Sequence, residues 1–119
     1  MSIGKHVAAR PEVLQGTLDL MLLKTLAALG PLHGYGIARR IEQVSGDLLK
    51  LNEGTIYTGL LRLQQQGWIS SKWGNSENNR RAKYYNVTLR GRKQLIAEEK
   101  NWVQFTGMID RFIKLAQGE

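Results

Sequence analysis

The chain has 119 residues, of which 42% are hydrophobic and 23% are charged, and these values are typical of a single folded domain. Its formal net charge is +7 and it contains no cysteine, which excludes disulfides, thiol catalysis and cysteine-ligated metals. The two histidines, His6 and His33, lie far apart in the sequence, so we expect neither a metal site nor a cofactor.

No segment of the sequence has the pattern of a membrane span or a secretory signal. The most apolar run, residues 18–30, includes Asp19 and Lys24 and is too short to cross a bilayer. The first twelve residues lack the apolar centre of a signal peptide. The pattern therefore predicts a soluble, cytoplasmic protein without a membrane partner.

Two helices are predicted in the first part of the chain. Leucines recur at helical spacing and predict a helix over residues 15–29, which Gly30 and Pro31 would end. Residues 1–13 would precede it as an N-terminal arm, and the first twelve of them fit either a mobile arm or a short helix. A second helix is predicted over residues 35–44. The side chains expected to face the core are Leu18, Leu22, Leu26, Leu29, Ile37, Ile41 and Val44.

A third helix is predicted to begin after Asn52, because an asparagine side chain can accept a hydrogen bond from a backbone N–H of the first turn. Gly67 is expected to end this helix. Its apolar stripe, which would lie against the core, consists of Ile56, Leu60 and Leu63. The opposite face would then carry Thr55, Thr58, Leu61, Arg62 and Gln65, with Tyr57 at its flank.

Two aromatic-rich runs, residues 68–73 and 82–88, surround a polar loop and predict a β-hairpin. Tyr85 and Val87 alternate along the second strand and are expected to face the core. Basic residues concentrate here: residues 72–93 include seven basic and one acidic side chain, a formal charge of +6. Such a field favours a polyanion such as nucleic acid, although it also fits a solvated patch. The seven are Lys72, Arg80, Arg81, Lys83, Arg90, Arg92 and Lys93.

Thr88 is expected to cap a last helix that reaches about residue 116. Apolar side chains recur at alternating spacings of three and four in its second half, which is heptad spacing. These residues are Trp102, Phe105, Ile109, Phe112 and Ala116. An apolar stripe that projects past the end of a small domain usually needs a partner helix, so the stripe predicts pairing with another helix.

The order of the elements predicts a fold that is mainly α with a small β-hairpin. We expect a winged helix-turn-helix over residues 14–88 and a C-terminal dimerisation helix over residues 89–119. In such domains the third helix enters the major groove of double-stranded DNA, where its side chains read base edges. The wing cations contact phosphates. On these grounds the expected DNA contacts are Thr55, Tyr57, Thr58, Leu61, Arg62, Arg80, Arg81 and Lys83.

Several alternatives fit the same residues. Arg62 could pair with a neighbouring acid instead of DNA, and Tyr57 could close the edge of the core. The whole domain could bind RNA or another protein, because fold alone does not decide function. An enzyme is not expected, since the sequence shows no nucleophile–base pairing and no phosphate-cradling loop.

Three segments together resemble the PadR-family transcriptional regulators, in the smaller subclass with a single C-terminal helix. They are HGYGI, LNEGTIYTGLLRLQQQGWI and WGNSENNRRAKYYNVTLRGRKQL, and the resemblance spans residues 14–102. Thr55 and Tyr57 match the start of the family's recognition helix. Its basic wing motif is matched by Arg80, Arg81, Lys83 and Tyr84. Thr58 and Leu61 depart from the common pattern, which affects the expected operator sequence and not the fold.

The resemblance implies a repressor that binds a pseudo-palindromic operator as a homodimer. It also implies that a small aromatic or xenobiotic effector relieves repression. Trp102 matches a tryptophan that contacts flat aromatic ligands at the dimer interface of some members. Alternatively, Trp102 only packs against Phe105 in the dimer seam.

Overall fold

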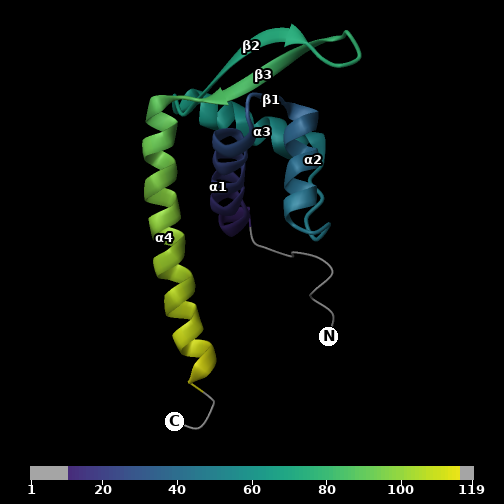
Figure 1. The fold of residues 1–119 in the computed structure, drawn as a ribbon. Coiled ribbons are helices and arrows are strands. Elements are labelled where there is room, and N and C mark those ends of the chain that lie inside the picture. The colour runs from purple at the N-terminus through teal and green to yellow at the C-terminus, as the bar shows by residue number, and fades with distance from the viewer. Residues whose placement is uncertain (1–10, 116–119) are drawn as a thin grey trace.

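The computed structural model describes residues 11–115, with side chains described from residue 16 onward. Three packed helices lie beneath a small sheet, and a long fourth helix runs away from them along one side (Figure 1). The elements in chain order are α1 (Pro11–Leu29), β1 (Leu32–His33), α2 (Gly34–Val44), α3 (Glu53–Gln65), β2 (Ile69–Asn75), β3 (Arg81–Val87) and α4 (Leu89–Lys114).

The core lies where α1, α2 and α3 meet. Most of the apolar positions predicted from periodicity are buried: Leu18, Leu22, Leu26, Ile37, Ile41, Ile56, Leu60 and Leu63. Two predictions were wrong, since Leu29 is 47% exposed and Val44 is 79% exposed. Each is the last residue of its helix. Leu23, which the single stripe did not include, is fully buried, so α1 is covered on more than one side.

The helix boundaries follow local capping chemistry. The Asn52 and Thr88 side chains accept hydrogen bonds from the N–H groups of Thr55 (2.8 Å) and Gly91 (3.0 Å), which confirms both predicted caps. α1 begins earlier than predicted, at Pro11, because proline is well tolerated in a first helical turn. Residues 11–13 therefore belong to α1 and not to an arm. The rest of the predicted arm, residues 1–10, lies outside the described residues.

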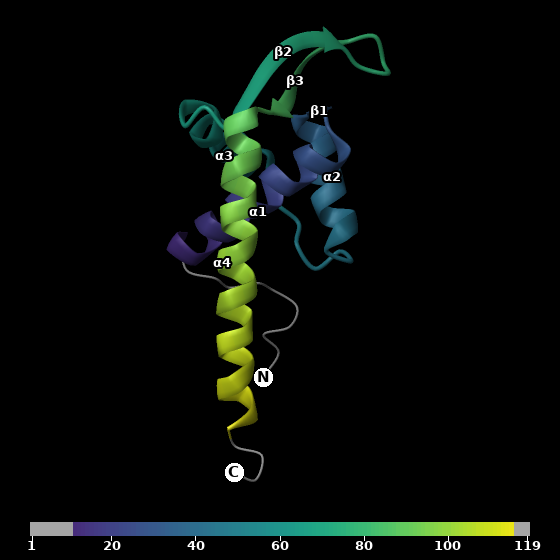
Figure 2. The ribbon, with the colours of Figure 1, turned by 60° about the vertical axis from the view of Figure 1, so that its left-hand side comes forward.

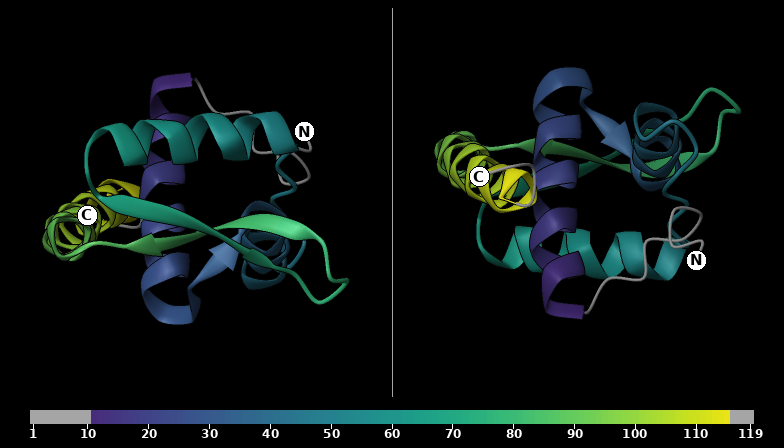
Figure 3. Two further views of the ribbon diagram at one scale, coloured as in Figure 1. Left: turned by 90° about the horizontal axis from the view of Figure 1, so that it is seen from above. Right: turned by 90° about the horizontal axis from the view of Figure 1, so that it is seen from below.

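The sheet has three antiparallel strands in the order β1-β3-β2. The β2–β3 hairpin was predicted, and Tyr85 and Val87 are buried as expected. The short strand β1 was not predicted. It pairs Leu32 with Tyr85 and His33 with Tyr84. Seen from above, both α3 and the β2–β3 ribbon cross α1 (Figure 3), so the wing is attached to the helical core along its inner end.

The first half of α4 is fixed to the domain. A Cβ atom at Gly91 would overlap the carbonyl oxygen of Trp68, so the helix can approach this closely only because residue 91 is glycine. Lys24 of α1 forms an ion pair with Glu99 at 2.9 Å. The second half of α4 projects past the other helices (Figure 2). Residue 116, the predicted end, lies outside the described residues, and no helix of the described part is long and apolar enough to cross a membrane.

Candidate nucleic-acid interface

The outer face of α3 carries most of the residues of that helix that were predicted to contact DNA. Leu61 is 58% exposed and Thr58 is also exposed, while Thr55 is half-buried beside the helix cap. Tyr57 is 46% exposed, and its ring packs where a side chain on Gly34 would otherwise lie. Tyr57 therefore closes the edge of the core with one side of its ring and still presents surface to solvent.

Arg62 was predicted to lie on this outer face, and that prediction was wrong. Its Nη2 donates to a carboxylate oxygen of Asp19 on α1 at 2.6 Å. Both side chains are largely buried, with exposed fractions of 26% for Arg62 and 16% for Asp19. The alternative that Arg62 pairs with an acid is thus the one the structure contains. The pair joins α3 to α1, and the charge of Arg62 is compensated within the domain.

The wing presents its cations just after a tight loop. The Ser76 N–H donates to the Arg80 carbonyl oxygen at 2.8 Å, and the Asn79 N–H donates to the Ser76 carbonyl oxygen at 2.9 Å. Asn79 has a φ of 58°, a left-handed conformation that asparagine adopts more readily than most residues. The loop returns the chain so that Arg80 and Arg81 are both exposed at the outer end of β3.

Trp73 was not among the predicted site residues, yet it lies among these cations. It is 57% exposed, and the Arg81 guanidinium carbon lies 5.0 Å from its ring centroid. The Lys83 ammonium nitrogen lies 5.7 Å from the same centroid. The sequence signal that could have pointed to this cluster is strand alternation, because it places Arg81 and Lys83 on one face of β3.

Tyr84 lies on the other face of the wing from Lys83. Its hydroxyl donates to the Asn75 carbonyl oxygen at 3.2 Å, and its ring meets His33 edge-on with centroids 5.4 Å apart. His33 in turn caps α2 by accepting from the Gly36 N–H at 3.0 Å. Tyr84 thus ties the outer wing to β1. This geometry gives it a supporting position, and its predicted DNA contact stays a prediction.

A groove of about 640 Å³ separates the wing from the N-terminal ends of α2 and α3. One wall carries the wing residues Trp73, Arg81 and Lys83, and the other carries Tyr35 and Tyr57. Tyr35 is 60% exposed, and sequence reasoning had not named it. The groove therefore combines cations, aromatic rings and phenolic hydroxyl groups, which together suit a phosphate backbone.

Tyr85 also lines this groove. Burial raises the pKa of the Tyr85 hydroxyl above its ordinary value of 10.0, and the neighbouring Tyr57 raises it further. A phenol is uncharged at neutral pH even at that ordinary value, and the raised pKa moves its ionisation further from neutrality, so Tyr85 adds no negative charge to the groove.

The apolar face of α4 is left uncovered by the described chain. Phe105, Ile109 and Phe112 are 49%, 39% and 63% exposed, and Trp102 is half-buried. The Trp102 and Phe105 rings meet edge-on, with centroids 5.6 Å apart. These are the residues predicted to form a dimer seam, with the exception of Ala116, which lies outside the described residues. Within residues 11–115, no group of three or more potential ligands could hold a metal ion.

The model of the PadR-like transcriptional regulator family matches residues 22–97 of this chain. A curated relative, the uncharacterised protein X of Lysinibacillus sphaericus, is 26% identical over 105 residues. That match covers 88% of this chain and 95% of the relative.

Solved structures agree with the family match. A transcriptional regulator from Clostridium thermocellum is 29% identical with a TM-score of 0.78, covering 90% of this chain and 100% of that one. A PadR-family regulator from Clostridium difficile is 30% identical with a TM-score of 0.69, covering 81% of this chain and 97% of that one. These matches confirm the predicted winged-helix fold. They are to transcriptional regulators and not to enzymes, as the sequence predicted.

The Arg62–Asp19 pair generates a prediction about stability. Asp19→Ala should lower the free energy of unfolding by about 1.5–3 kcal/mol, because it leaves the partly buried guanidinium without its charged acceptor. Arg62→Ala should cost a similar amount. Chemical denaturation monitored by circular dichroism measures both changes.

The exposed pair between Lys24 and Glu99 supplies the control. Glu99→Ala should cost less than about 1 kcal/mol, since pairs at the surface contribute little. Equal losses from Asp19→Ala and Glu99→Ala would contradict a structural role for Arg62.

Proposed function

This chain belongs to the PadR-like family of transcriptional regulators, and we propose that it is a dimeric, sequence-specific DNA-binding repressor relieved by a small aromatic or xenobiotic ligand. The observation that carries the DNA-binding part is the groove between wing and helices. Wing cations and Tyr57 of α3 line the same groove, so a duplex that meets one surface also meets the other.

The two surfaces divide the work of recognition. Thr58 and Leu61 on α3 can read base edges and thymine methyl groups in the major groove. Arg80, Arg81 and Lys83 bind phosphates, which positions the domain on DNA without reading its sequence. Phosphate binding by these cations also makes affinity depend on salt, because bound counterions are released.

Dimerisation provides a second DNA-binding domain, which can bind the second half-site of an operator. The uncovered face of α4 contains a heptad of apolar side chains, and a second copy of the chain is the simplest partner for it. Two chains joined in this way present two α3 helices to successive major grooves, as a pseudo-palindromic operator requires. Repression follows when the dimer occupies its promoter.

The effector would act at the same interface. Trp102 lies at the level where α4 leaves the domain, and its ring is half-buried against Phe105. An aromatic ligand stacked on Trp102 in the dimer would favour one spacing of the two DNA-binding domains. Ligand binding then lowers DNA affinity if the favoured spacing differs from the DNA-bound one.

DNA binding is tested first. We expect the protein to prefer the DNA upstream of its own gene over a shuffled sequence. The double change Arg80→Ala and Arg81→Ala should weaken binding to both and flatten the dependence of log affinity on log salt by about one unit per lost phosphate contact. Fluorescence anisotropy over a range of salt concentrations measures this.

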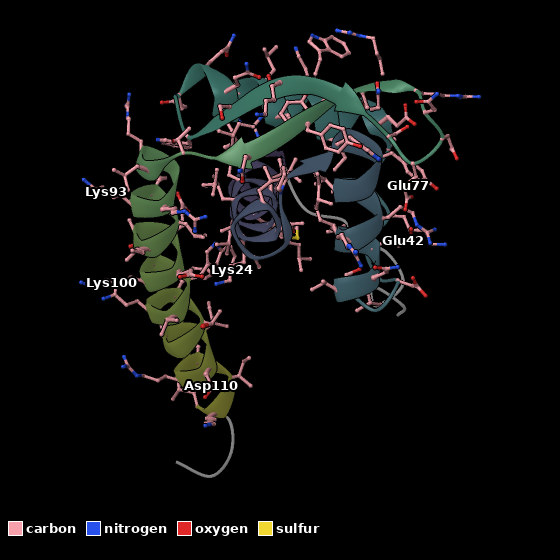
Figure 4. All side chains as sticks on the ribbon, turned by 45° about the horizontal axis from the view of Figure 1, so that its top comes forward. Lys24, Glu42, Glu77, Lys93, Lys100 and Asp110 are labelled. Atoms are coloured by element: carbon pink, nitrogen blue, oxygen red, sulfur yellow. The ribbon has the colours of Figure 1, made fainter. Side chains whose placement is uncertain are left out.

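The matched control removes two cations elsewhere. Lys93 and Lys100 lie on the side of α4 turned away from α1 (Figure 4), and their double replacement by alanine should leave the salt slope nearly unchanged. Equal effects of the two double changes would contradict the wing assignment. If the wild-type protein bound RNA or another protein but no DNA, the proposed function would be wrong.

The dimer prediction concerns Phe112. Phe112→Glu places a charge in the proposed seam and should shift the protein from dimer to monomer in sedimentation equilibrium, because an unpaired charge is costly to bury. Gln104→Glu adds the same charge at an exposed position outside the seam and should leave the dimer intact. A monomeric wild-type protein at micromolar concentration would sink the dimer proposal.

The ligand prediction concerns Trp102. A panel of planar aromatic compounds titrated by calorimetry should give at least one ligand that weakens DNA binding, and Trp102→Ala should lower its affinity by about tenfold or more. Phe112→Ala, in the same helix, tests whether any loss of an aromatic ring in the seam has this effect. Unchanged affinity in Trp102→Ala would rule out the stacking role.

A further inference from the structure

Trp73 is a large aromatic side chain that projects from the wing instead of entering the core. It is 57% exposed, and exposing so much aromatic surface forgoes the stabilisation that burial would give. Two cations lie over its ring: the Arg81 guanidinium carbon at 5.0 Å and the Lys83 ammonium nitrogen at 5.7 Å from the ring centroid. These distances are within the range in which a cation is attracted to the face of a tryptophan.

Strand register explains how one ring reaches both cations. Trp73 of β2 lies directly opposite Lys83 of β3 in the antiparallel ladder, and Asn75 lies opposite Arg81. Arg81 is therefore the diagonal neighbour of Trp73 on the same face. Directly opposed and diagonal side chains are the two kinds of cross-strand neighbour that long or aromatic residues can contact.

The contact with Trp73 differs from an ion pair in its effect on charge. Among the residues that the structure describes, neither Arg81 nor Lys83 pairs with a carboxylate. An ion pair would neutralise the cation that a phosphate needs. An aromatic ring restricts the motion of the long side chain but leaves its full positive charge. The side chain is therefore ordered while the positive field of the wing is kept.

Ordering these side chains in advance matters for binding. Fixing a long flexible side chain upon association costs conformational entropy. Arg81 and Lys83 also repel each other, because they project from the same face of β3. A ring beside both cations can offset this repulsion, and both cations line the groove together with Tyr57.

We propose that Trp73 is a positioning residue of the DNA-binding surface, whose ring holds Arg81 and Lys83 in the groove without neutralising them. This inference rests on the proposed function. The role of Trp73 requires the aromatic face and not simply apolar bulk. The proposal therefore predicts that phenylalanine can replace Trp73 and that leucine cannot.

The test compares Trp73→Phe with Trp73→Leu in the full-length protein. A mixed-sequence DNA duplex spanning two helical turns serves as probe, since phosphate contacts do not depend on sequence. We expect Trp73→Leu to weaken binding by about three- to tenfold at low salt, the size expected for two exposed cation–aromatic contacts. Trp73→Phe should retain most of the affinity. Lys72→Ala, a loss of charge on the opposite face of β2, is the control for changes in wing charge alone.

A double-variant experiment separates positioning from direct contact. If Trp73 acts through the cations, Trp73→Leu should have no further effect once Arg81 and Lys83 are both alanine. A loss of the same size in that background would mean that Trp73 contacts DNA itself, and equal losses in the phenylalanine and leucine variants would mean that the aromatic face is irrelevant. Either result overturns the proposal.

A measurement without DNA keeps this inference separate from the proposed function. In the free protein, side-chain protons of Arg81 and Lys83 should be shifted upfield by the Trp73 ring in nuclear magnetic resonance spectra, and Trp73→Leu should remove the shift. Thermal unfolding verifies that the variants are folded. Upfield shifts in a protein that binds no duplex would sink the proposed function and leave the ordering role supported, whereas unshifted protons would overturn the ordering role even in a protein that binds DNA.

Discussion

Leu22, Leu23 and Leu26 of α1 are at most 1% exposed, and α2, α3, α4 and β3 all pack against the helix that carries them. Each buried leucine contributes about 1.5–3 kcal/mol of hydrophobic stabilisation, so their burial fixes how the other elements are placed. The close approach of α3 depends on Gly59, where a Cβ would lie 2.8 Å from a Leu22 methyl group. Because the inner face of α3 is held in this way, its outer face is directed away from the core as a rigid surface.

The wing has a different physical character from the core. Its cations lie close together on a narrow two-stranded ribbon, and its loop includes a residue in the left-handed region, Asn79. Both features place positive charge where a polyanion can approach, and aromatic neighbours at Trp73 and Tyr84 support the strands that carry it. The inner ends of the wing strands, at Ile69, Tyr85 and Val87, belong to the buried core, while the charge at the outer end of the wing is available for binding.

A single face of α4 connects the winged-helix domain to the proposed dimer seam. Leu95, Trp102 and Ile109 follow one another at seven-residue intervals on this face. Leu95 is 6% exposed within the domain, Trp102 is half-buried at its edge, and Ile109 is 39% exposed beyond it. The same heptad therefore first packs against α1 and then continues past it. A second chain bound to the outer half would be linked rigidly to the DNA-binding surface of the first.

The sequence by itself determined the helices, the β2–β3 hairpin and most of the core of this protein. Apolar spacing located the helices, alternation located the β2–β3 hairpin, and Asn52 and Thr88 marked two helix starts, because all of these depend on interactions within a few residues. It also located the exposed cations Arg80 and Arg81, since charged side chains rarely enter a core.

Only the tertiary structure decided how distant residues combine. Arg62 turns from the outer face of α3 to Asp19, which is 43 positions away in the sequence, and no local pattern selects that partner over DNA. Strand β1 exists only because β3 offers it an edge, so its two residues carry no signal of their own. The ring of Trp73 meets Arg81 and Lys83 through cross-strand register. Such contacts depend on which surfaces pack together, and chain packing is a property of the whole fold.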